Sequence, residues 1–373
     1  GNREKADRAA TLGIALTLIH CIFFIIAGLT ISEPFLKLFT DNPKILNDAS
    51  IYTEIVLCLS FGSLFQIAFE KIFQGIGEMK ITMYLLIAGC VVNIILDPIL
   101  IFGLLGFPAL GVAGAAIATV IGQISALLLY IIVYRRNSYA VHISFKHLVF
   151  DKAIIRQIYS VGIPSTVMML LPSILISVLN SILTAFSDVY VAVLGVYFKL
   201  QTFIYMPANG IVQGMRPIIG YNYGAKEYGR VKKAIVFVSA VSVLYTLGVW
   251  SLVHAFPEFF IRIFNRTGDL VEAGIPAMRI YFFGFFMMAF QFAGQAIFVG
   301  LGKAKNAVFF SIFRKVIIVI PLIIILPSMF HMGTDGILMA EPVSNFIGGT
   351  ACFVTMLCTV WPELTKGERD KNK

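Results

Sequence analysis

Two polar residues, Asn93 and Asp97, interrupt an otherwise apolar run that reads "NIILDPILIF" from 93 to 102. On a helix they lie one turn apart on the same face. A carboxylate inside a membrane costs about 2.5–3.5 kcal/mol on insertion scales, so Asp97 is expected to face a cavity or a partner. The alternative is structural: both residues satisfy backbone groups that are freed by Pro98, which cannot donate a hydrogen bond and kinks a helix.

Other charged residues also lie in apolar stretches. Glu70 in "FEKIFQ" is followed by Lys71, which is expected either to pair with another group or to snorkel toward the membrane surface. Glu341 precedes Pro342, and Lys199 lies midway along "VYFKLQTF". Because a lone lysine at the membrane centre is costly, we expect Lys199 to line an aqueous cleft or to pair with an acid, for which we predict Glu341. The alternative is that each of the two faces water separately.

The sequence has no pattern typical of catalysis or metal binding. It contains no paired aspartate motif, no His–carboxylate dyad and no G-x-S-x-G elbow. Its five cysteines lie in apolar runs without the spacing of metal ligands, so they are expected to pack as small hydrophobic residues. We therefore predict that the protein is not an enzyme and has no metal site and no cofactor. A membrane-embedded transferase is a distant alternative.

The composition places these residues in a membrane. Hydrophobic residues make up 58% of the 373-residue chain and charged residues 13%, against roughly 25% charged in soluble domains. Apolar runs of about 20 residues recur, the length at which a helix crosses a bilayer. We predict an all-α integral membrane protein with ten spans, at 8–32, 51–76, 81–104, 111–134, 157–185, 189–213, 233–256, 273–299, 306–328 and 336–360.

One segment of the sequence occurs twice. "FQIAFEKIFQGIGEMK" at 65–80 and "FQFAGQAIFVGLGKAK" at 290–305 are identical at eight of sixteen positions, with an offset of 290 − 65 = 225. The same offset aligns "FLKLF" at 35–39 with "FIRIF" at 260–264, and after a slip of three residues "GVAGAAIA" at 111–118 aligns with "GTDGILMA" at 333–340. Glu70 aligns with Gln295, so this position tolerates an amide. The repeat indicates two homologous lobes.

The repeat also predicts the domain organisation. We expect the rest of an N-terminal lobe at 1–134, a basic cytoplasmic connector at 135–156, a C-terminal lobe at 157–361 and a charged tail at 362–373. About 67 residues of the second lobe, 157–223, have no counterpart in the first, so we expect an intact molecule with six spans per lobe that lacks its first two spans here. Lobes with even span numbers are related by a pseudo-twofold axis along the membrane normal.

Basic residues predict the orientation. The loops expected on one side carry nineteen Lys and Arg residues, and those on the other carry four. The rich side, with both ends of the chain, is therefore expected to be cytoplasmic. The net charge of +9 needs no nucleic-acid partner, because anionic lipid headgroups balance it.

Two long segments carry a family resemblance. "NIILDPILIFGLLGFPALGVAGAAIAT" at 93–119 and "LQTFIYMPANGIVQGMRPIIGYNYGAKEYGRVKKA" at 200–234, with the "GIGEMK" and "GLGKAK" turns, resemble the multidrug and toxic compound extrusion family. The resemblance implies that Asn93 and Asp97, with Thr119, form a site for H⁺ or Na⁺ in the first lobe. In the family, another acid from the first span usually joins this cluster, and that span lies outside this chain.

Two further groups of residues are expected to serve transport. Helix breakers are expected to let spans bend when the cleft changes sides, or else to permit close packing of helices: Pro98, Pro207, Gly210 and Pro217. Sulfur-containing and aromatic side chains are expected to line a pocket for planar cations, or else to face lipid: Met168, Met169, Phe203, Tyr205 and Met206.

The resemblance implies a multidrug efflux transporter that exports organic, cationic and amphipathic compounds by antiport with H⁺ or Na⁺ through alternating access. We expect a monomer in the plasma membrane, with small molecules and lipids as partners. The nearer alternative is a flippase of the same superfamily for a lipid-linked saccharide. A flippase is expected to have more than twelve spans and a strongly cationic cavity, whereas the sequence suggests Lys199 and few other cations at mid-membrane.

Overall fold

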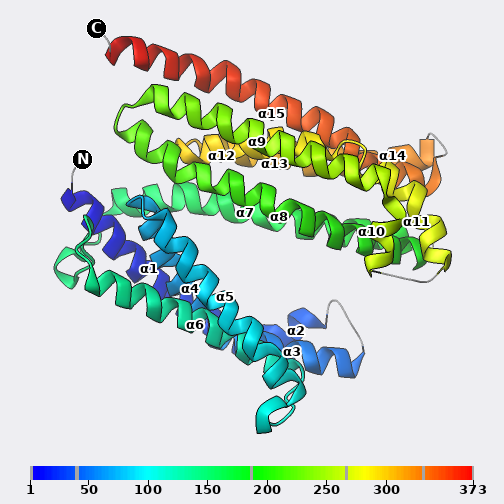
Figure 1. Ribbon diagram of the computed structural model, residues 1–373, viewed down its shortest axis with the longest axis horizontal. Helices are drawn as coiled ribbons and strands as arrows, with labels where there is room; N and C mark the ends of the chain where they lie inside the picture. Colours follow the sequence, from blue (N-terminus) through cyan, green and yellow to red (C-terminus); the bar gives the residue numbers. More distant parts are fainter. Residues whose placement is uncertain (1–2, 38–41, 185–187, 265–267, 330–331, 372–373) are drawn as a thin grey trace. The chain divides into compact units, whose positions relative to one another are not determined.

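The computed structural model describes residues 3–37, 42–184, 188–264, 268–329 and 332–371. Across these residues the chain forms helices joined by turns and short loops, without strands (Figure 1). The all-α prediction is therefore confirmed. The chain divides into two compact units, Gly1–Arg156 and Gln157–Lys373.

The first unit is built from long helices around one closely packed pair. Its helices are α1 (Arg3–Thr30), α2 (Ser32–Leu36), α3 (Pro43–Cys58), α4 (Phe61–Gly75), α5 (Met79–Phe102) and α6 (Val112–Arg136), with the short 3₁₀ turns η1 (Leu104–Gly106) and η2 (Phe145–His147). Small residues bring α5 and α6 together: a Cβ added at Gly89 would lie 2.8 Å from Cβ of Ala126, and one at Gly122 would lie 3.0 Å from Cβ of Asn93. This close approach places the α6 backbone beside Asn93.

The second unit contains longer helices and one irregular span. Its helices are α7 (Lys152–Thr184), α8 (Asp188–Gly224), α9 (Tyr228–Ala255), α10 (Pro257–Phe264), α11 (Gly268–Tyr281), η3 (Phe285–Met287), α12 (Met288–Gly300), α13 (Ala304–Ile312), the π-helical segment η4 (Phe313–Val319), α14 (Ile320–Met329) and α15 (Gly333–Lys371). Two clusters of buried apolar side chains hold it together, one around Tyr197 and Phe282 and the other around Met215 and Phe298.

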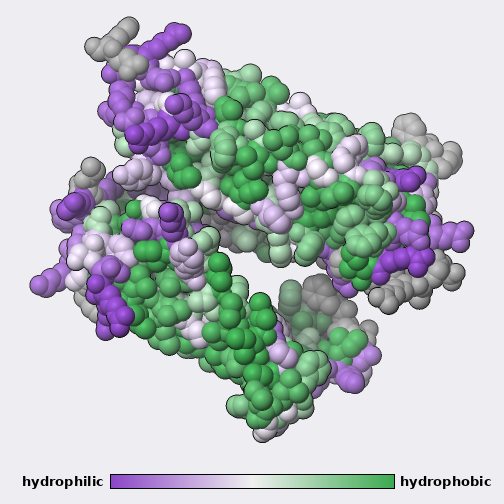
Figure 2. Space-filling model, viewed as in Figure 1, coloured by the Kyte–Doolittle hydropathy of each residue, from purple (hydrophilic) through white to green (hydrophobic). Residues whose placement is uncertain are grey.

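Among the described residues, eight helices are long and apolar enough to cross a membrane, and a ninth span results if α3 and α4, bent by 50°, count as one. In the part of the chain that the structure describes, the predicted ranges coincide largely with helices, but the count of ten spans is not confirmed. The predicted span 189–213 falls in α8, which is not among the eight. In the second unit, hydrophobic surface lies between more polar ends (Figure 2), as expected for helices that are surrounded by lipid.

The repeated sequence forms the same turn in both units. Gly77 has φ +91° and Gly302 has φ +75°, a left-handed conformation that glycine adopts without strain. In the first turn the backbone N–H of Glu78 donates to the carbonyl of Phe73 at 2.9 Å, and in the second that of Lys303 donates to Phe298 at 2.7 Å. Both bonds close the end of a helix in the manner of a glycine C-cap. The repeat therefore specifies a local structure twice.

Candidate functional site

The first candidate site lies between α4, α5 and α6 of the first unit. Asn93 Nδ2 donates a hydrogen bond to Asp97 Oδ1 at 3.3 Å, as their spacing of one helical turn predicts. Asn93 and Thr119 line one cavity of about 190 Å³, together with Gln66 and Gln123. The Thr119 hydroxyl donates to the Ala115 carbonyl at 2.9 Å, so its oxygen lone pairs remain available as acceptors. The structure thus brings Asn93 to both Asp97 and Thr119, although Asp97 is not among the residues that line this cavity.

The second candidate site contains a buried ion-pair cluster between α13–α14 and α15. Glu341 Oε1 lies 3.2 Å from Lys315 Nζ and 3.6 Å from Arg314 Nη1. Arg314 Nη1 also donates to Asn345 Oδ1, one turn along α15 from Glu341. The side chains of Arg314 and Glu341 are 3% and 6% exposed. Charges this deeply buried persist only when they are paired and hydrogen-bonded.

The sequence around Arg314 and Lys315 explains how two basic residues enter an apolar span. Both lie in the π-helical segment η4, and Pro321 follows shortly after its end. Pro321 cannot donate to the preceding turn, which disturbs the regular ladder of hydrogen bonds. On the facing helix, a Cβ added at Gly348 would lie 2.8 Å from Cγ of Arg314. The absence of a side chain at Gly348 therefore leaves room for the arginine stem.

A cavity of about 310 Å³ adjoins this cluster, and we call it the basic cavity. Its charged residues are Arg216 from α8 and Arg314 and Lys315 from η4. Polar and apolar side chains from α7, α8, α12 and α13 complete its lining: Ser165, Met168, Met169, Leu171, Pro172, Tyr205, Asn209, Val212, Gln213, Gln291, Phe292, Gln295 and Ser311. Its volume lies at the lower end of the range for small-molecule sites, and ten of its sixteen lining residues are polar or charged.

The sequence matches the family model described as MatE over residues 1–99 and 164–325. The chain belongs to this family, the multidrug and toxic compound extrusion (MATE) family. Because MATE proteins are transporters, the prediction that the protein is not an enzyme is confirmed. The family also accounts for the apolar helices, since its members are multi-pass membrane proteins.

Named relatives and solved structures agree with the MATE assignment. The chain is 29% identical to the multidrug export protein MepA of Staphylococcus aureus (strain MSSA476) over 92% of this chain and 73% of that protein. It is 30% identical to the MATE multidrug transporter DinF-BH, with a TM-score of 0.83, over 96% of this chain and 82% of that structure. An outward-facing MATE transporter of the MOP superfamily, at 22% identity, has a TM-score of 0.89 over 99% and 81% of the two chains.

The predicted pairing of Lys199 with Glu341 is wrong. Glu341 pairs with Lys315 and Arg314 instead. Lys199 is exposed and lies in a shallow surface depression with Phe203 and Met206. The two basic residues that satisfy Glu341 come from a neighbouring helix, and spacing along one helix gives no information about such a contact.

The predicted apolar pocket divides into two places. Met168, Met169 and Tyr205 line the basic cavity, whereas Phe203 and Met206 are 75% and 64% exposed elsewhere on α8. Residues two positions apart on a helix point about 200° apart, so Phe203 and Tyr205 cannot share one wall. The grouping of all five around one pocket is therefore wrong.

The repeat partners Glu70 and Gln295 make different contacts. Glu70 Oε1 accepts from Lys71 at 2.9 Å and from Gln74 Nε2 at 2.8 Å on its own helix. Gln295 is buried, lines the basic cavity and donates to the Ser311 hydroxyl at 2.8 Å. Glu70 is therefore neutralised locally, and Gln295 belongs to the second site.

The predicted bending positions lie inside continuous helices. α5 runs through Pro98, and α8 runs through Pro207, Gly210 and Pro217. Their role as hinges remains a prediction.

Several residues of both sites were not predicted from the sequence. Arg314 and Lys315 stand next to each other inside a predicted span, and such a pair of charges is costly enough to indicate a buried partner. Arg216 lies in the segment that carries the family resemblance. Gln66 and Gln291 are identical members of the repeat and line the two cavities, so the repeat itself was a signal for them.

Proposed function

We propose that the protein exports amphipathic organic compounds by antiport with H⁺ or Na⁺ through alternating access. The observation that supports the proposal is the carboxylate of Asp97, which accepts a hydrogen bond from Asn93 within a membrane-spanning helix. Membership of the MATE family and the names of its relatives support multidrug efflux. Organic cations are the substrate class that the sequence resemblance favours.

The proposed coupling rests on the charge of Asp97. When Asp97 takes up H⁺ or Na⁺ its charge is neutralised, and the preferred packing of α5 against α6 changes. Antiport follows if the cation and the substrate stabilise different conformations, since a ligand with equal affinity for two conformations shifts neither. The excess of basic residues in one set of loops supports an orientation in the plasma membrane with the ends of this chain in the cytoplasm.

Dye efflux tests this function. The protein is expressed in cells that lack their own pumps, and export of a fluorescent cationic dye is followed with and without H⁺ and Na⁺ gradients. Asp97→Asn is expected to lower gradient-driven export at least tenfold. Glu54→Gln, which removes an exposed carboxylate of the same unit, is the matched control and is expected to retain export. Export by Asp97→Asn at the parental rate would refute the role of Asp97 in coupling.

A second candidate, a flippase for a lipid-linked saccharide, is favoured by the basic cavity. The sequence suggested few cations besides Lys199 at mid-membrane, but three basic side chains of the second unit line this cavity. That argument against a flippase therefore does not hold. Transfer of a fluorescent lipid-linked saccharide between leaflets of proteoliposomes tests this candidate, and transfer without an ion gradient is expected of it.

A further inference from the structure

We propose that the basic cavity is an oxoanion site, which binds a carboxylate or phosphate group carried by the transported compound. The identification of this ligand as the transported substrate rests on the proposed function. It goes beyond that function because it assigns the charge of the group that the second unit recognises. It also concerns residues that lie well apart in the sequence from the Asp97 site.

The basic cavity has an excess of positive charge. Three cationic side chains, Arg216, Arg314 and Lys315, line the cavity. Among the described residues, Glu341 is the one carboxylate within 4 Å of any of them, and it lies against Lys315 and Arg314. Two positive charges thus remain without a neutralising carboxylate (3 − 1 = 2). Since an unpaired buried charge costs several kcal/mol, the cavity favours an anionic ligand.

The two arginines of the cavity also have hydrogen-bond donors without acceptors in the described residues. Nε of Arg314 and Nε of Arg216 are both buried and have no hydrogen-bond partner within the described parts of the chain. Arg314 is only 2% exposed, so bulk water does not replace that partner. A guanidinium presents its N–H groups in a planar fork that matches carboxylate and phosphate oxygens. An oxoanion in the cavity would satisfy these donors.

The other lining residues add neutral polar groups and aromatic rings. Gln295 and Ser311 hydrogen-bond to each other beside the cations, and Tyr205 and Phe292 form an edge-to-face pair with ring centroids 4.6 Å apart. The lining of the cavity therefore combines cationic and aromatic side chains. This combination fits an aromatic or aliphatic molecule that carries one oxoanion, and the volume of about 310 Å³ accommodates such a ligand.

The repeat shows that this charge is specific to the second unit. With the offset of 225, Arg314 and Lys315 align with Gly89 and Cys90. Gly89 and Cys90 line the first-unit cavity, whose lining contains no basic residue in the part that the structure describes. Equivalent helices therefore form a cavity without basic residues in one unit and a cationic cavity in the other. Helix packing alone does not require the charges of the second cavity.

Binding of a matched pair of dyes tests the proposal. The purified protein is titrated with a rhodamine methyl ester, which is cationic, and with the corresponding free acid, which also carries a carboxylate. Fluorescence anisotropy gives the two dissociation constants. We expect the free acid to bind at least tenfold more tightly. Arg314→Gln and Arg216→Gln are expected to bring the ratio of the two constants close to one, and Arg314→Lys to give an intermediate ratio.

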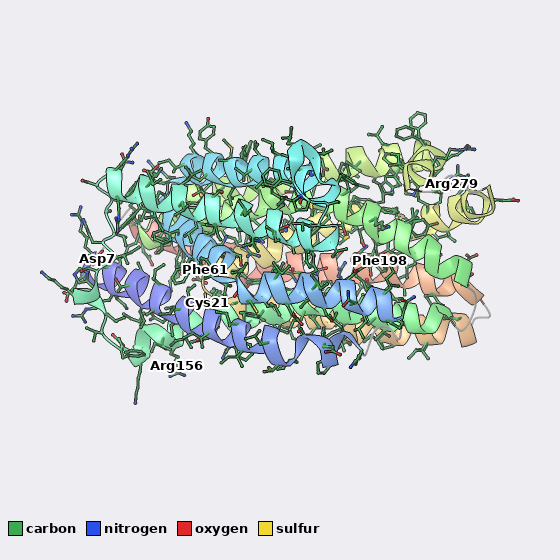
Figure 3. All side chains as sticks on the ribbon, turned by 90° about the horizontal axis from the view of Figure 1, so that it is seen from below. Asp7, Cys21, Phe61, Arg156, Phe198 and Arg279 are labelled. Carbon is green, nitrogen blue, oxygen red and sulfur yellow. The ribbon has the colours of Figure 1, made fainter. Side chains whose placement is uncertain are left out.

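The matched control is Arg279→Gln, which removes an exposed arginine on α11 of the same unit (Figure 3) and is expected to retain the preference. The ratio is measured within each protein, so partial unfolding of a variant does not alter it. Competition identifies the source of the oxoanion. Displacement by benzoate indicates a small carboxylate, and displacement by phosphatidylglycerol vesicles but not by benzoate or phosphatidylcholine vesicles indicates a lipid phosphate.

Equal binding of ester and acid by the parent protein would overturn the proposal, as would a preference that survives both arginine substitutions. Failure to bind either dye, together with no stabilisation by benzoate or phosphatidylglycerol in thermal unfolding, would overturn it as well. These results are separable from the export test. Gradient-driven, Asp97-dependent export of the ester would leave the proposed function intact, and selective binding of the acid without such export would leave the anion site intact.

Discussion

The buried carboxylate of Glu341 provides a quantitative test of the second-unit cluster. Replacement by Gln keeps the shape of the side chain and removes its charge. Glu341 Oε1 is 3.2 Å from Lys315 Nζ and 3.6 Å from Arg314 Nη1. With an effective dielectric constant of about 20, Coulomb's law gives roughly 5 kcal/mol for each contact. Repulsion between the two cations and the cost of their desolvation offset much of this attraction.

The net loss of stability is better estimated from buried ion pairs in which one partner has been removed. Such changes cost about 3–5 kcal/mol, because they leave an uncompensated buried charge. At about 2–4 °C per kcal/mol for a unit of this size, Glu341→Gln is expected to lower the unfolding midpoint by about 6–20 °C. The double variant Glu341→Gln/Lys315→Gln is expected to recover part of this loss, since one of the two unpaired cations is then absent.

Intrinsic fluorescence is a suitable assay because both tryptophans of the chain, Trp250 and Trp361, belong to the second unit. The midpoint is measured on purified protein in detergent for the parent, both single variants and the double variant. Glu258→Gln, which removes one partner of an exposed i,i+4 pair with Arg262, is the control and is expected to change stability by less than about 1 kcal/mol. The reasoning that the two cations need Glu341 for their stability would be refuted if the unfolding midpoint of Glu341→Gln lay within about 2 °C of the control. A difference of that size is less than the shift expected for about 1 kcal/mol.

Three further predictions concern the turns and the packing of each unit. Gly302→Ala places a side chain at φ +75° and is expected to lower the free energy of unfolding by about 1–2 kcal/mol. Its control is Gly248→Ala, in the middle of α9 with no atom within 4 Å of the added Cβ, which is expected to raise the free energy of unfolding by about 0.5–1 kcal/mol. An unchanged fluorescence midpoint in Gly302→Ala would contradict the strain at φ +75°. Asp7, labelled in Figure 3, accepts a hydrogen bond from the backbone N–H of His142 at 2.8 Å. Asp7→Ala is expected to cost about 1–3 kcal/mol and to speed proteolysis of the 137–151 loop. The control Glu4→Ala removes an exposed residue of the same helix that is paired only with Arg8 among the contacts described, and its loop is expected to be cleaved at the parental rate; equal cleavage of both variants would count against the Asp7 anchor. Gly114→Ala places a Cβ too close to the Leu100 carbonyl and is expected to reduce the yield of folded protein in size-exclusion chromatography. The control is Gly13→Ala, whose added Cβ meets no atom within 4 Å. Equal yields would show that α5 and α6 can separate there at little cost in free energy.

Several features of the molecule followed from the sequence because they depend on neighbours along the chain. Long apolar runs predicted helices, since a backbone in lipid must satisfy its own hydrogen bonds. Gly77 and Gly302 end helices in the same way because their local sequences are alike. Asn93 and Asp97 contact each other because four residues make about one turn. Each of these interactions is decided within a few residues.

The tertiary structure decided which side chains meet across helices. Arg216 and Arg314 are 314 − 216 = 98 positions apart and line one cavity, and Glu341 binds Lys315 rather than the predicted Lys199. Helical periodicity fixes the face on which a residue lies, but the rotation of one helix against the next depends on the packing of many side chains at once. The sequence by itself therefore determined the helices, their turns and the family, and only the packed helices determined the partner of Glu341 and the basic cavity.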